Sequence, residues 1–341
     1  MGPEAQRRWK ANWSFLTRKA GFAVATLVVL SFLCYLLAFS SGSHLQALLT
    51  ERLSGGGRVV LTPAQIQAVT DDLVRYYHHG QPLYVGYFSW LGEVLQGNLG
   101  QSVAGGPVVS EVAPWIIPTV MLQVPAVVTS LLLGLVLGVF AASRRGSLID
   151  RMVNGASAMT FGIPSFWLAI VGIVVISYGL RLLPSFGAYS PYPPYWWGSQ
   201  TADAVAHYIL PFSVLVVVST PLYLRVARAS ALEVLSKDWV RSMTLASVGR
   251  RRIIYRHVLK NSAGPALALF AYNLAIFLAA APGIEIAFGW PGLGLRFVEA
   301  SLEFDQPTML AIIMIMGLVA VAASFVVDAI QAAIDPRVSL A

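Results

Sequence analysis

The chain has 341 residues and a formal net charge of +7, with 57% hydrophobic and only 11% charged side chains. A soluble domain of this size would carry about 25% charged residues, so this composition excludes a large soluble protein and indicates several membrane spans. A basic excess fits a nucleic-acid surface, an acidic lipid surface or the cytoplasmic loops of a membrane protein, and the apolar composition favours the loops. The single cysteine, Cys34, lies in an apolar run and cannot form an internal disulfide.

The N-terminal region carries five basic side chains before an apolar stretch from Gly21 to Phe39. This order is similar to a secretory signal peptide, but an apolar run of about 19 residues is too long for one. We therefore predict an N-terminal tail over 1–20 and a retained first transmembrane helix over 21–40.

A long segment, 41–118, follows the first span. It contains a glycine-rich stretch from Ser54 to Gly57 and then Thr62-Pro63, a pattern typical of a helix start. Because aromatic residues are frequent in it, we expect a small helical lobe packed on the spans rather than a disordered loop.

Six apolar segments are long enough to span a bilayer, at about 20 residues each. They are 21–40, 119–142, 155–180, 205–224, 265–284 and 309–332. Eighteen of the 23 Lys and Arg residues lie on one alternating set of connections, and five lie on the other. The asymmetry predicts that both termini and the loops 143–154 and 225–263 are cytoplasmic, with the 41–118 lobe outside and a five-helix core over 119–341. The aromatic run Pro191–Trp197, just outside a span, fits an interfacial belt or a contact with a docking partner.

The segment from Arg225 to Pro265 is amphipathic and does not span. Leu232, Leu235, Trp239 and Met243 recur at helical spacing and predict one apolar stripe. Glu233, Lys237 and Arg241 predict a charge ladder on another face, and Gly249 fits a helix stop before an arginine run that leads back to the membrane. This pattern fits a rigid elbow that contacts a soluble partner, and it equally fits an amphipathic helix on anionic lipid.

The same segment resembles the coupling loop of permeases in binding-protein-dependent ABC importers, in the dipeptide, oligopeptide and nickel branch. The matching residues are Ser230, Leu232, Glu233, Val234, Leu235, Asp238, Val240, Arg241, Arg252, Tyr255, Arg256, His257, Leu259, Asn261 and Pro265. Matches elsewhere are Gln81–Val85, Gly97–Ser102, Arg145–Ser147, Asp150–Arg151, Pro164–Trp167, Phe288–Gly294, Asp328 and Asp335–Arg337. One position departs from the pattern, because the family's usual coupling-loop glycine falls on Ser247.

The resemblance implies an all-α polytopic membrane protein with six transmembrane helices and the type I ABC importer permease (MetI-like) fold, with an extracytoplasmic insertion after the first helix. It also implies a second homologous permease subunit, two ATPase subunits gripping the coupling loops, and an extracytoplasmic substrate-binding protein. We predict ATPase-coupling roles for Leu232, Glu233, Asp238, Arg241, Ser242, Ala246, Ser247, Gly249, Arg252 and His257. We predict a place near the translocation path or the binding-protein dock for Pro164, Ser165, Asn273, Trp290 and Pro291.

Other motifs in the sequence do not indicate a phosphate, ATP or metal site on this chain. The glycines of Gly289–Gly294 are not followed by Lys-Ser/Thr, so a tight turn or short re-entrant element around Trp290 is favoured over a phosphate loop. No GxxxxGK[ST] motif occurs, so ATP and Mg²⁺ are expected on partner subunits. The five histidines, including the adjacent pair His78-His79, form no spaced metal set. We expect no catalytic residue, metal, cofactor or nucleic acid on this chain.

Several polar residues lie in or beside the predicted spans. Glu285 and Asp328 are near span ends, where each carboxylate could be solvated or paired rather than used for ion coupling. Asn273 and Gln123 lie within apolar runs and either line a cavity or bond neighbouring helices.

The sequence thus predicts a permease subunit of an ATP-driven importer of the cytoplasmic membrane, embedded in the lipid bilayer and most consistent with peptide cargo. Nickel or oligosaccharide cargo is the alternative within the branch. A secondary transporter would need inverted repeats and midplane ion sites, and neither is evident. In the expected mechanism, ATP closes the ATPase pair and draws the coupling loops together, which switches the cavity between its two openings.

Overall fold

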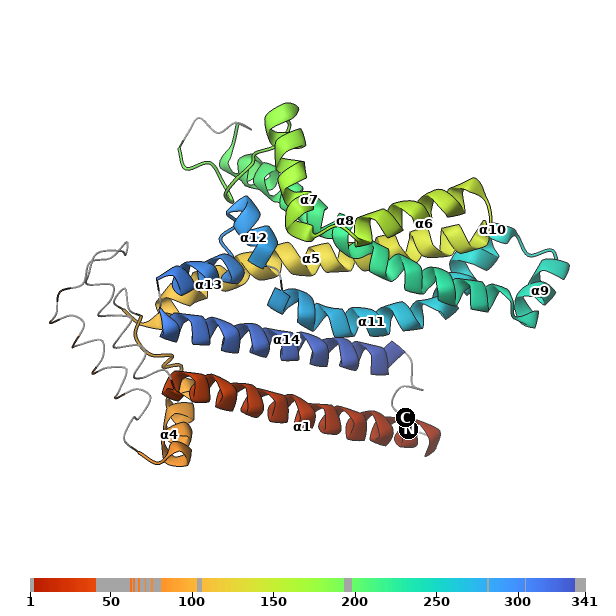
Figure 1. Ribbon diagram of the computed structural model, residues 1–341. Helices are drawn as coiled ribbons and strands as arrows, with labels where there is room; N and C mark the ends of the chain where they lie inside the picture. Colours follow the sequence, from red (N-terminus) through yellow and green to blue (C-terminus); the bar gives the residue numbers. More distant parts are fainter. Residues whose placement is uncertain are drawn as a thin grey trace. The chain divides into compact units, whose positions relative to one another are not determined.

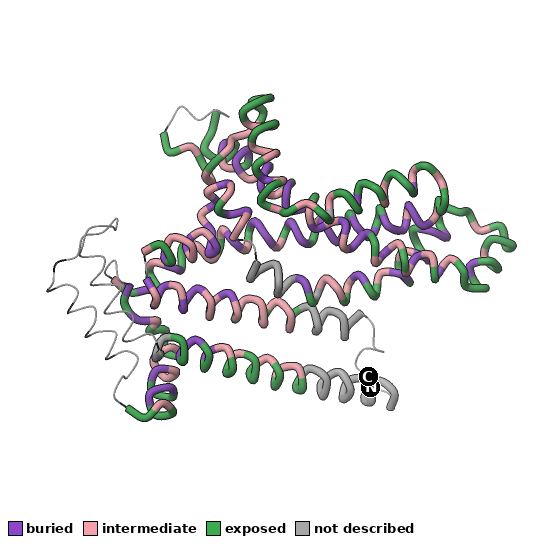
Figure 2. The backbone as a smooth tube through the Cα atoms, viewed as in Figure 1, coloured by how far each residue is buried: buried purple, intermediate pink, exposed green. Residues whose placement is uncertain are grey.

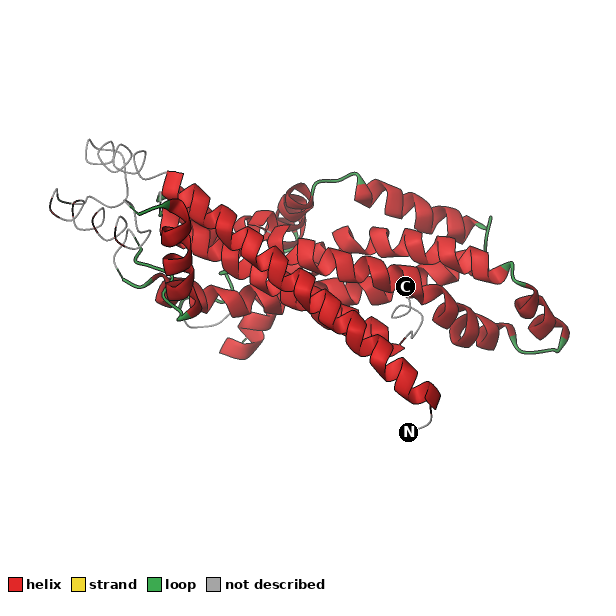
Figure 3. Ribbon diagram, turned by 90° about the horizontal axis from the view of Figure 1, so that it is seen from below, coloured by secondary structure: helices red, strands yellow, loops and turns green. Residues whose placement is uncertain are grey.

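In the computed structural model the described residues are 3–40, 81–102, 106–192, 198–280, 282–303 and 305–334, with the single residues Thr62, Ala64, Gln67, Asp71 and Arg75. The glycine-rich stretch 54–57, the pair at 78–79, residues 193–197 of the aromatic run, the matched residues 335–337 and the side chain at position 328 lie outside them. The described residues form helices and loops, with one isolated β-bridge between Gln101 and Pro107 (Figure 3). The predicted all-α class is confirmed.

Figure 1 shows the order of the helices along the chain. Their bounds are α1 Pro3–Ser40, α4 Leu83–Leu95, α5 Val108–Ser143, α6 Leu148–Phe161, α7 Ser165–Gly172, η1 Ile173–Gly179, α8 Gln200–Leu235, α9 Asp238–Leu245, α10 Arg250–Arg252, η2 Ile253–Val258, α11 Leu259–Ala280, α12 Pro282–Phe288, α13 Leu293–Leu302 and α14 Gln306–Ile334. The two η elements are π-helical turns, which continue α7 and connect α10 to α11.

Among the described residues, four helices are long and apolar enough to cross a membrane: Thr17–Leu37 within α1, Val108–Ser143, Gln200–Leu235 and Gln306–Val326. They coincide with the first, second, fourth and sixth predicted spans. Figure 2 shows exposed stretches along these helices. The exposed residues include the large apolar Phe22, Leu37 and Leu132, as expected for surfaces that face lipid.

The third and fifth predicted spans differ from single uninterrupted helices. The third is bent by 101° between α6 and α7, and its two arms together give a fifth candidate span. Gly162 and Pro164 flank this break. Proline has no N–H, so residue 164 cannot continue the hydrogen bonding of α6. The fifth predicted span, 265–284, corresponds to α11, which ends at Ala280 rather than at 284, since Pro282 begins α12. Four to five spans are consistent with the six expected.

The chain divides into two compact units, and the first comprises residues 1–119 and 291–326. Its α4 lies within the predicted outer lobe and packs on α1 through aromatic side chains. The Tyr35 and Trp90 rings lie 5.4 Å apart, and the Tyr87 and Ser31 hydroxyls are hydrogen-bonded at 2.9 Å. Cys34 is buried in this same cluster, as a small core residue.

The second unit comprises residues 120–290 and 327–341 and contains α6 to α12 with most of α5. Here α5 and α8 approach closely because α5 presents glycines four residues apart. A methyl group on Gly134 would lie 2.5 Å from the Tyr223 Cβ, and one on Gly138 would lie 2.6 Å from the Leu224 carbonyl oxygen. Small residues at this spacing let membrane helices pack backbone against backbone. This contact fixes the helix from which the coupling segment extends.

Candidate functional site

The coupling segment begins as an extension of a membrane helix. α8 starts at the Ser199 cap and runs without interruption to Leu235, well past the predicted span end at 224. A turn at Ser236 and Lys237 then separates α8 from the eight-residue α9. The expectation of one continuous stripe from Leu232 to Met243 is therefore wrong, because this turn interrupts the helix.

The apolar residues of the segment pack inward. Val240 of α9 is buried in a cluster formed by Val139 and Ala142 of α5, Ala231 and Val234 of α8, and Ile253, Ile254 and Val258 of η2. Leu232, Leu235 and Met243 pack against this cluster, whereas Trp239 remains 37% exposed. Most of the predicted stripe is thus not offered to a partner. Burial of one aliphatic side chain contributes roughly 1.5–3 kcal/mol, so the cluster holds α9 firmly in place.

The end of α9 is a Schellman turn centred on Ser247. The Val248 N–H donates to the Met243 carbonyl and the Ser247 N–H donates to the Thr244 carbonyl, each at 3.1 Å. Ser247 has φ of +58°, the left-handed conformation that such a turn needs and that glycine adopts most easily. The helix stop predicted at Gly249 is therefore wrong: the left-handed residue is Ser247, and Gly249 has φ of −54° and caps α10.

The predicted coupling residues are mostly exposed around this elbow, which we define as residues 236–249. Asp238, Arg241, Ser242, Ala246, Ser247 and Gly249 of the elbow are exposed, as are the flanking Glu233 and Arg252, whereas Leu232 and His257 are half-buried. Glu233 and Lys237 form an exposed ion pair at 3.1 Å, but the turn excludes Arg241 from the predicted ladder. The elbow also exposes Leu245, at 79%.

A polar network that sequence reasoning did not single out lies behind the elbow. Arg228 of α8 donates to both oxygens of the Asp150 carboxylate, at 2.8 and 2.9 Å. Asp150 is buried, and its carboxylate also accepts hydrogen bonds from the Gly146 N–H at 3.0 Å and the Asn154 amide at 2.8 Å. Part of this was readable, because Ser147 caps α6 and Ser-x-x-Asp predicts a capping pair. The Arg228 partner is distant in sequence and carries no such signal.

A further hydrogen bond joins α10 to the end of α5. The Arg250 guanidinium of α10 donates to the Ser143 carbonyl at the end of α5, at 2.6 Å. Together with the Asp150 network it connects the adjacent ends of α5, α6, α8 and α10. We call these five residues, Ser143, Gly146, Asp150, Arg228 and Arg250, the polar collar.

Near the N-terminal end of α8, aromatic side chains of the second unit pack around Trp290. The indole is buried with Leu168 and Ala169 of α7, and its ring lies 5.9 Å from that of Tyr208 in an edge contact. Gly289, with φ of +56°, has no room for a Cβ, because the Phe186 ring occupies that position. Trp290 is thus wedged among helices, as the tight-turn interpretation predicts.

The other predicted path residues come from separate elements: Pro291 directly follows Trp290, Asn273 lies in α11, and two lie at the start of α7. Pro164 and Ser165 begin α7 at the bend. Asn273 is buried, and its amide donates to Leu269 in its own helix at 2.9 Å, while Pro291 belongs to the first unit. Glu285 is fully buried rather than solvated, and the Gln123 amide donates to its carboxylate at 3.4 Å, which links α5 and α12.

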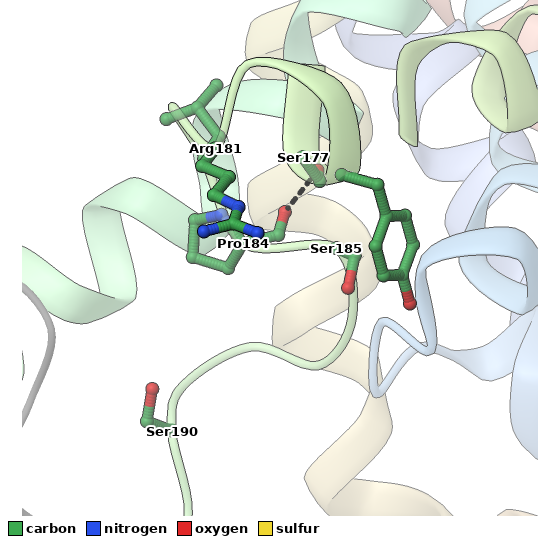
Figure 4. A pocket seen from close by; sticks show the side chains of 7 residues that line it. Ser177, Arg181, Pro184, Ser185 and Ser190 are labelled. Carbon is green, nitrogen blue, oxygen red and sulfur yellow. Dashed lines mark hydrogen bonds between the residues drawn. The ribbon is translucent and has the colours of Figure 1, made fainter. Parts of the chain in front are cut away.

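A half-open pocket of about 220 Å³ lies beside the α7–η1 end, lined by Ser177, Tyr178, Arg181, Leu183, Pro184, Ser185 and Ser190 (Figure 4). Hydrogen bonds fix its wall: the Ser177 hydroxyl donates to the Pro184 carbonyl at 3.2 Å, and Ser190 donates through both its N–H and its hydroxyl to the buried Asp203. Arg181 has φ of +54° and is exposed. Its guanidinium is suited to hydrogen-bonding a small anionic group.

The first unit contains two buried polar networks of its own that were also missed. Arg296 of α13 forms ion pairs with Glu111 at 2.7 Å and Glu303 at 3.0 Å. Burial alone would lower the pKa of the Arg296 guanidinium, but the hydrogen bonds to Glu111 and Glu303 hold its pKa above the usual value. Asp305 is fully buried and accepts from the Ser102 and Thr308 hydroxyls. These networks fasten α13 to α5 and residue 102 to the start of α14.

The sequence matches a known class of membrane protein. Residues 134–340, more than half of the chain, match the model of the binding-protein-dependent transport system inner membrane component, and the chain belongs to this family. It is therefore a multi-pass transport permease.

Curated relatives cover most of its length. An oligopeptide transport system permease protein of Bacillus subtilis, AppB, is 28% identical over 82% of this chain and 88% of its own length. A putative peptide permease protein of Brucella suis is 30% identical over 81% of this chain and 86% of its own. The metal-staphylopine import system permease protein CntB of Staphylococcus aureus is 28% identical over 95% of this chain and 98% of its own.

Proposed function

We propose that this chain is one of two homologous permease subunits of an ATP-driven peptide importer, and that its elbow contacts a separate ATPase subunit. Both termini and the elbow lie in the cytoplasm, a binding protein delivers peptide from outside, and ATP and Mg²⁺ bind to the ATPase subunits. No catalytic step takes place on this chain.

The observation that carries the proposal is the division of the elbow into a buried and an exposed side. Val240 and Met243 anchor α9 to the helices behind it, while Asp238, Arg241 and Ser242 face outward. A helix lying on lipid would expose an apolar face, but the outer side of α9 is largely polar. A rigid, mainly polar projection with exposed Trp239 and Leu245 instead suits a protein groove.

The first test replaces Asp238 with lysine. Asp238→Lys reverses one charge on the outer side of α9 without touching the buried cluster, so membrane insertion and assembly should persist while uptake is lost and ATP hydrolysis no longer responds to the binding protein. Uptake by reconstituted complexes is the measurement. Gln200→Lys, at the exposed opposite end of α8, is the matched control and should transport normally. Normal uptake by Asp238→Lys would refute the proposed role.

A second test locates the elbow directly. A photo-crosslinking amino acid at Leu245, which is 79% exposed, should label an ATPase subunit in the assembled complex. Labelling of the binding protein instead would place the elbow on the opposite side of the membrane and overturn the orientation.

Cargo has a second candidate, because CntB belongs to a metal-staphylopine import system. Peptide is favoured by AppB and the Brucella suis relative. Calorimetry with the cognate binding protein separates the two: submicromolar binding of peptides supports the proposal, and binding only of a metal chelate rejects it.

A further inference from the structure

The polar collar lies at the junction between the elbow and the bent α6–α7 pair. Arg228 is two helical turns before the end of α8, and Asp150 is in the first turn of α6. Their two charge-assisted hydrogen bonds, at 2.8 and 2.9 Å, fix the guanidinium and carboxylate planes relative to each other, so one helix cannot slide along the other without breaking both.

We propose that Asp150 and Arg228 are positioning residues that transmit movement of the elbow to α6, and through it to the bend before α7. The inference rests on the proposed function, since it takes the elbow to be the element that the ATPase moves. It adds a second route of transmission: α8 carries the movement along its own axis, and the ion pair carries it sideways into α6.

The neighbouring contacts support this route. The Ser157 hydroxyl donates to the Pro221 carbonyl, and the Arg225 guanidinium donates to the Ser157 carbonyl, each at 3.5 Å. These two contacts are long and weak, whereas the Asp150–Arg228 pair is a firm connection between the two antiparallel helices. Beyond Phe161 the chain bends by 101°, and a displaced α6 would therefore change the angle at Gly162–Pro164.

Stability alone is a poor explanation for this pair. The Asp150 side chain is 6% exposed and that of Arg228 is 25% exposed. Replacing a largely buried ion pair with well-packed neutral residues is often neutral or stabilising, because taking charges out of water costs about as much as their attraction returns. What an ion pair of this geometry supplies is a fixed register between α6 and α8, which is what transmission requires.

The decisive variant removes both charges together. Asp150→Asn with Arg228→Gln leaves no buried unpaired charge, so the complex should assemble and hydrolyse ATP. We expect the number of peptides imported per ATP hydrolysed to fall about tenfold, within the range of typical coupling effects. A merely structural pair predicts wild-type import per ATP in this variant, and that result would overturn the proposal. Arg145→Gln, which removes an exposed charge from the turn between α5 and α6, is the control and should leave this ratio unchanged.

A second measurement does not depend on how the double variant folds. Spin labels at Leu148→Cys and Leu245→Cys, both exposed in the native chain, report the distance between the start of α6 and the elbow in the assembled transporter. If the collar is rigid, this distance should change by less than about 2 Å between nucleotide-free and ATP-bound states, the size of ordinary helix shifts. A larger change would mean that the elbow moves independently of α6, and it would overturn the proposal.

The two hypotheses fail in different ways. Normal uptake by Asp238→Lys contradicts the proposed contact with the ATPase. Uncoupling by Asp238→Lys, together with wild-type import per ATP in the double variant, contradicts only the role of the Asp150–Arg228 pair.

Discussion

The α5–α8 contact and the elbow are parts of one unit with opposite construction. At the contact, Gly134 and Gly138 bring backbones together with no space for another atom, whereas the elbow projects polar side chains from a small buried anchor. Atoms of this chain occupy the space between α5 and α8, whereas the outer side of the elbow is exposed. Substitutions at the α5–α8 contact should therefore change the stability of the fold, whereas substitutions at the elbow should change the contact with a partner.

The largest effect on stability is expected at Gly138. Its Cβ would lie 2.6 Å from a carbonyl oxygen and 2.9 Å from the Ala227 Cβ, so Gly138→Ala forces the two helices apart. Overpacking of this kind costs about 1–3 kcal/mol of unfolding free energy, and it should lower the thermal midpoint of the detergent-solubilised complex. Gly155→Ala is the control, because nothing lies near the added methyl group, and alanine there should stabilise α6 by up to about 1 kcal/mol. Equal midpoints for the two variants would contradict the close packing.

A smaller effect is expected at Ser247. Because its φ is +58°, Ser247→Gly should relieve about 1 kcal/mol of backbone strain, while Ser247→Val should add strain and loosen the end of α9. Trypsin cleavage at the arginines that follow Gly249 should slow in the glycine variant and accelerate in the valine variant. Ser242→Val, in the right-handed body of α9, is the control. Identical cleavage rates for all three would argue against the Schellman turn.

The smallest effect is expected at Lys237. Its side chain is 52% exposed and pairs with the 72% exposed Glu233, and such surface pairs contribute about 0.3–0.5 kcal/mol. Lys237→Ala should therefore leave the thermal midpoint of the isolated chain within error. A clear loss of affinity for the ATPase in that variant would sharpen the comparison, because it would place Lys237 in the partner contact rather than in folding.

Sequence reasoning located the apolar helices well, because a bilayer imposes a length and a composition that a single chain displays openly. It merged α6 with α7 because an apolar window passes across Gly162 and Pro164 without registering a bend. It extended one stripe across Ser236 and Lys237 because helical spacing persists by chance through a short turn. These errors concern local direction, which apolar composition does not encode.

The polar network was out of reach for a different reason. Asp150 and Arg228 are 78 positions apart, and only the packing of α6 on α8 brings them together. The elbow surface could be predicted because its residues are consecutive. The family pattern, which has glycine at position 247, indicated the left-handed residue. Serine itself does not, because its side chain does not favour a positive φ.

The continuity of α8 has a mechanical consequence. Its 36 residues extend about 54 Å, while the hydrocarbon layer is about 30 Å thick, so a large part of the helix must protrude into water. Any tilt within the lipid is then magnified at the protruding tip: a rotation of about 10° swings one end by about 9 Å relative to the other. Conversely, a pull of a few ångströms at the tip is enough to reorient the membrane portion by several degrees, so the transporter gains leverage from length alone.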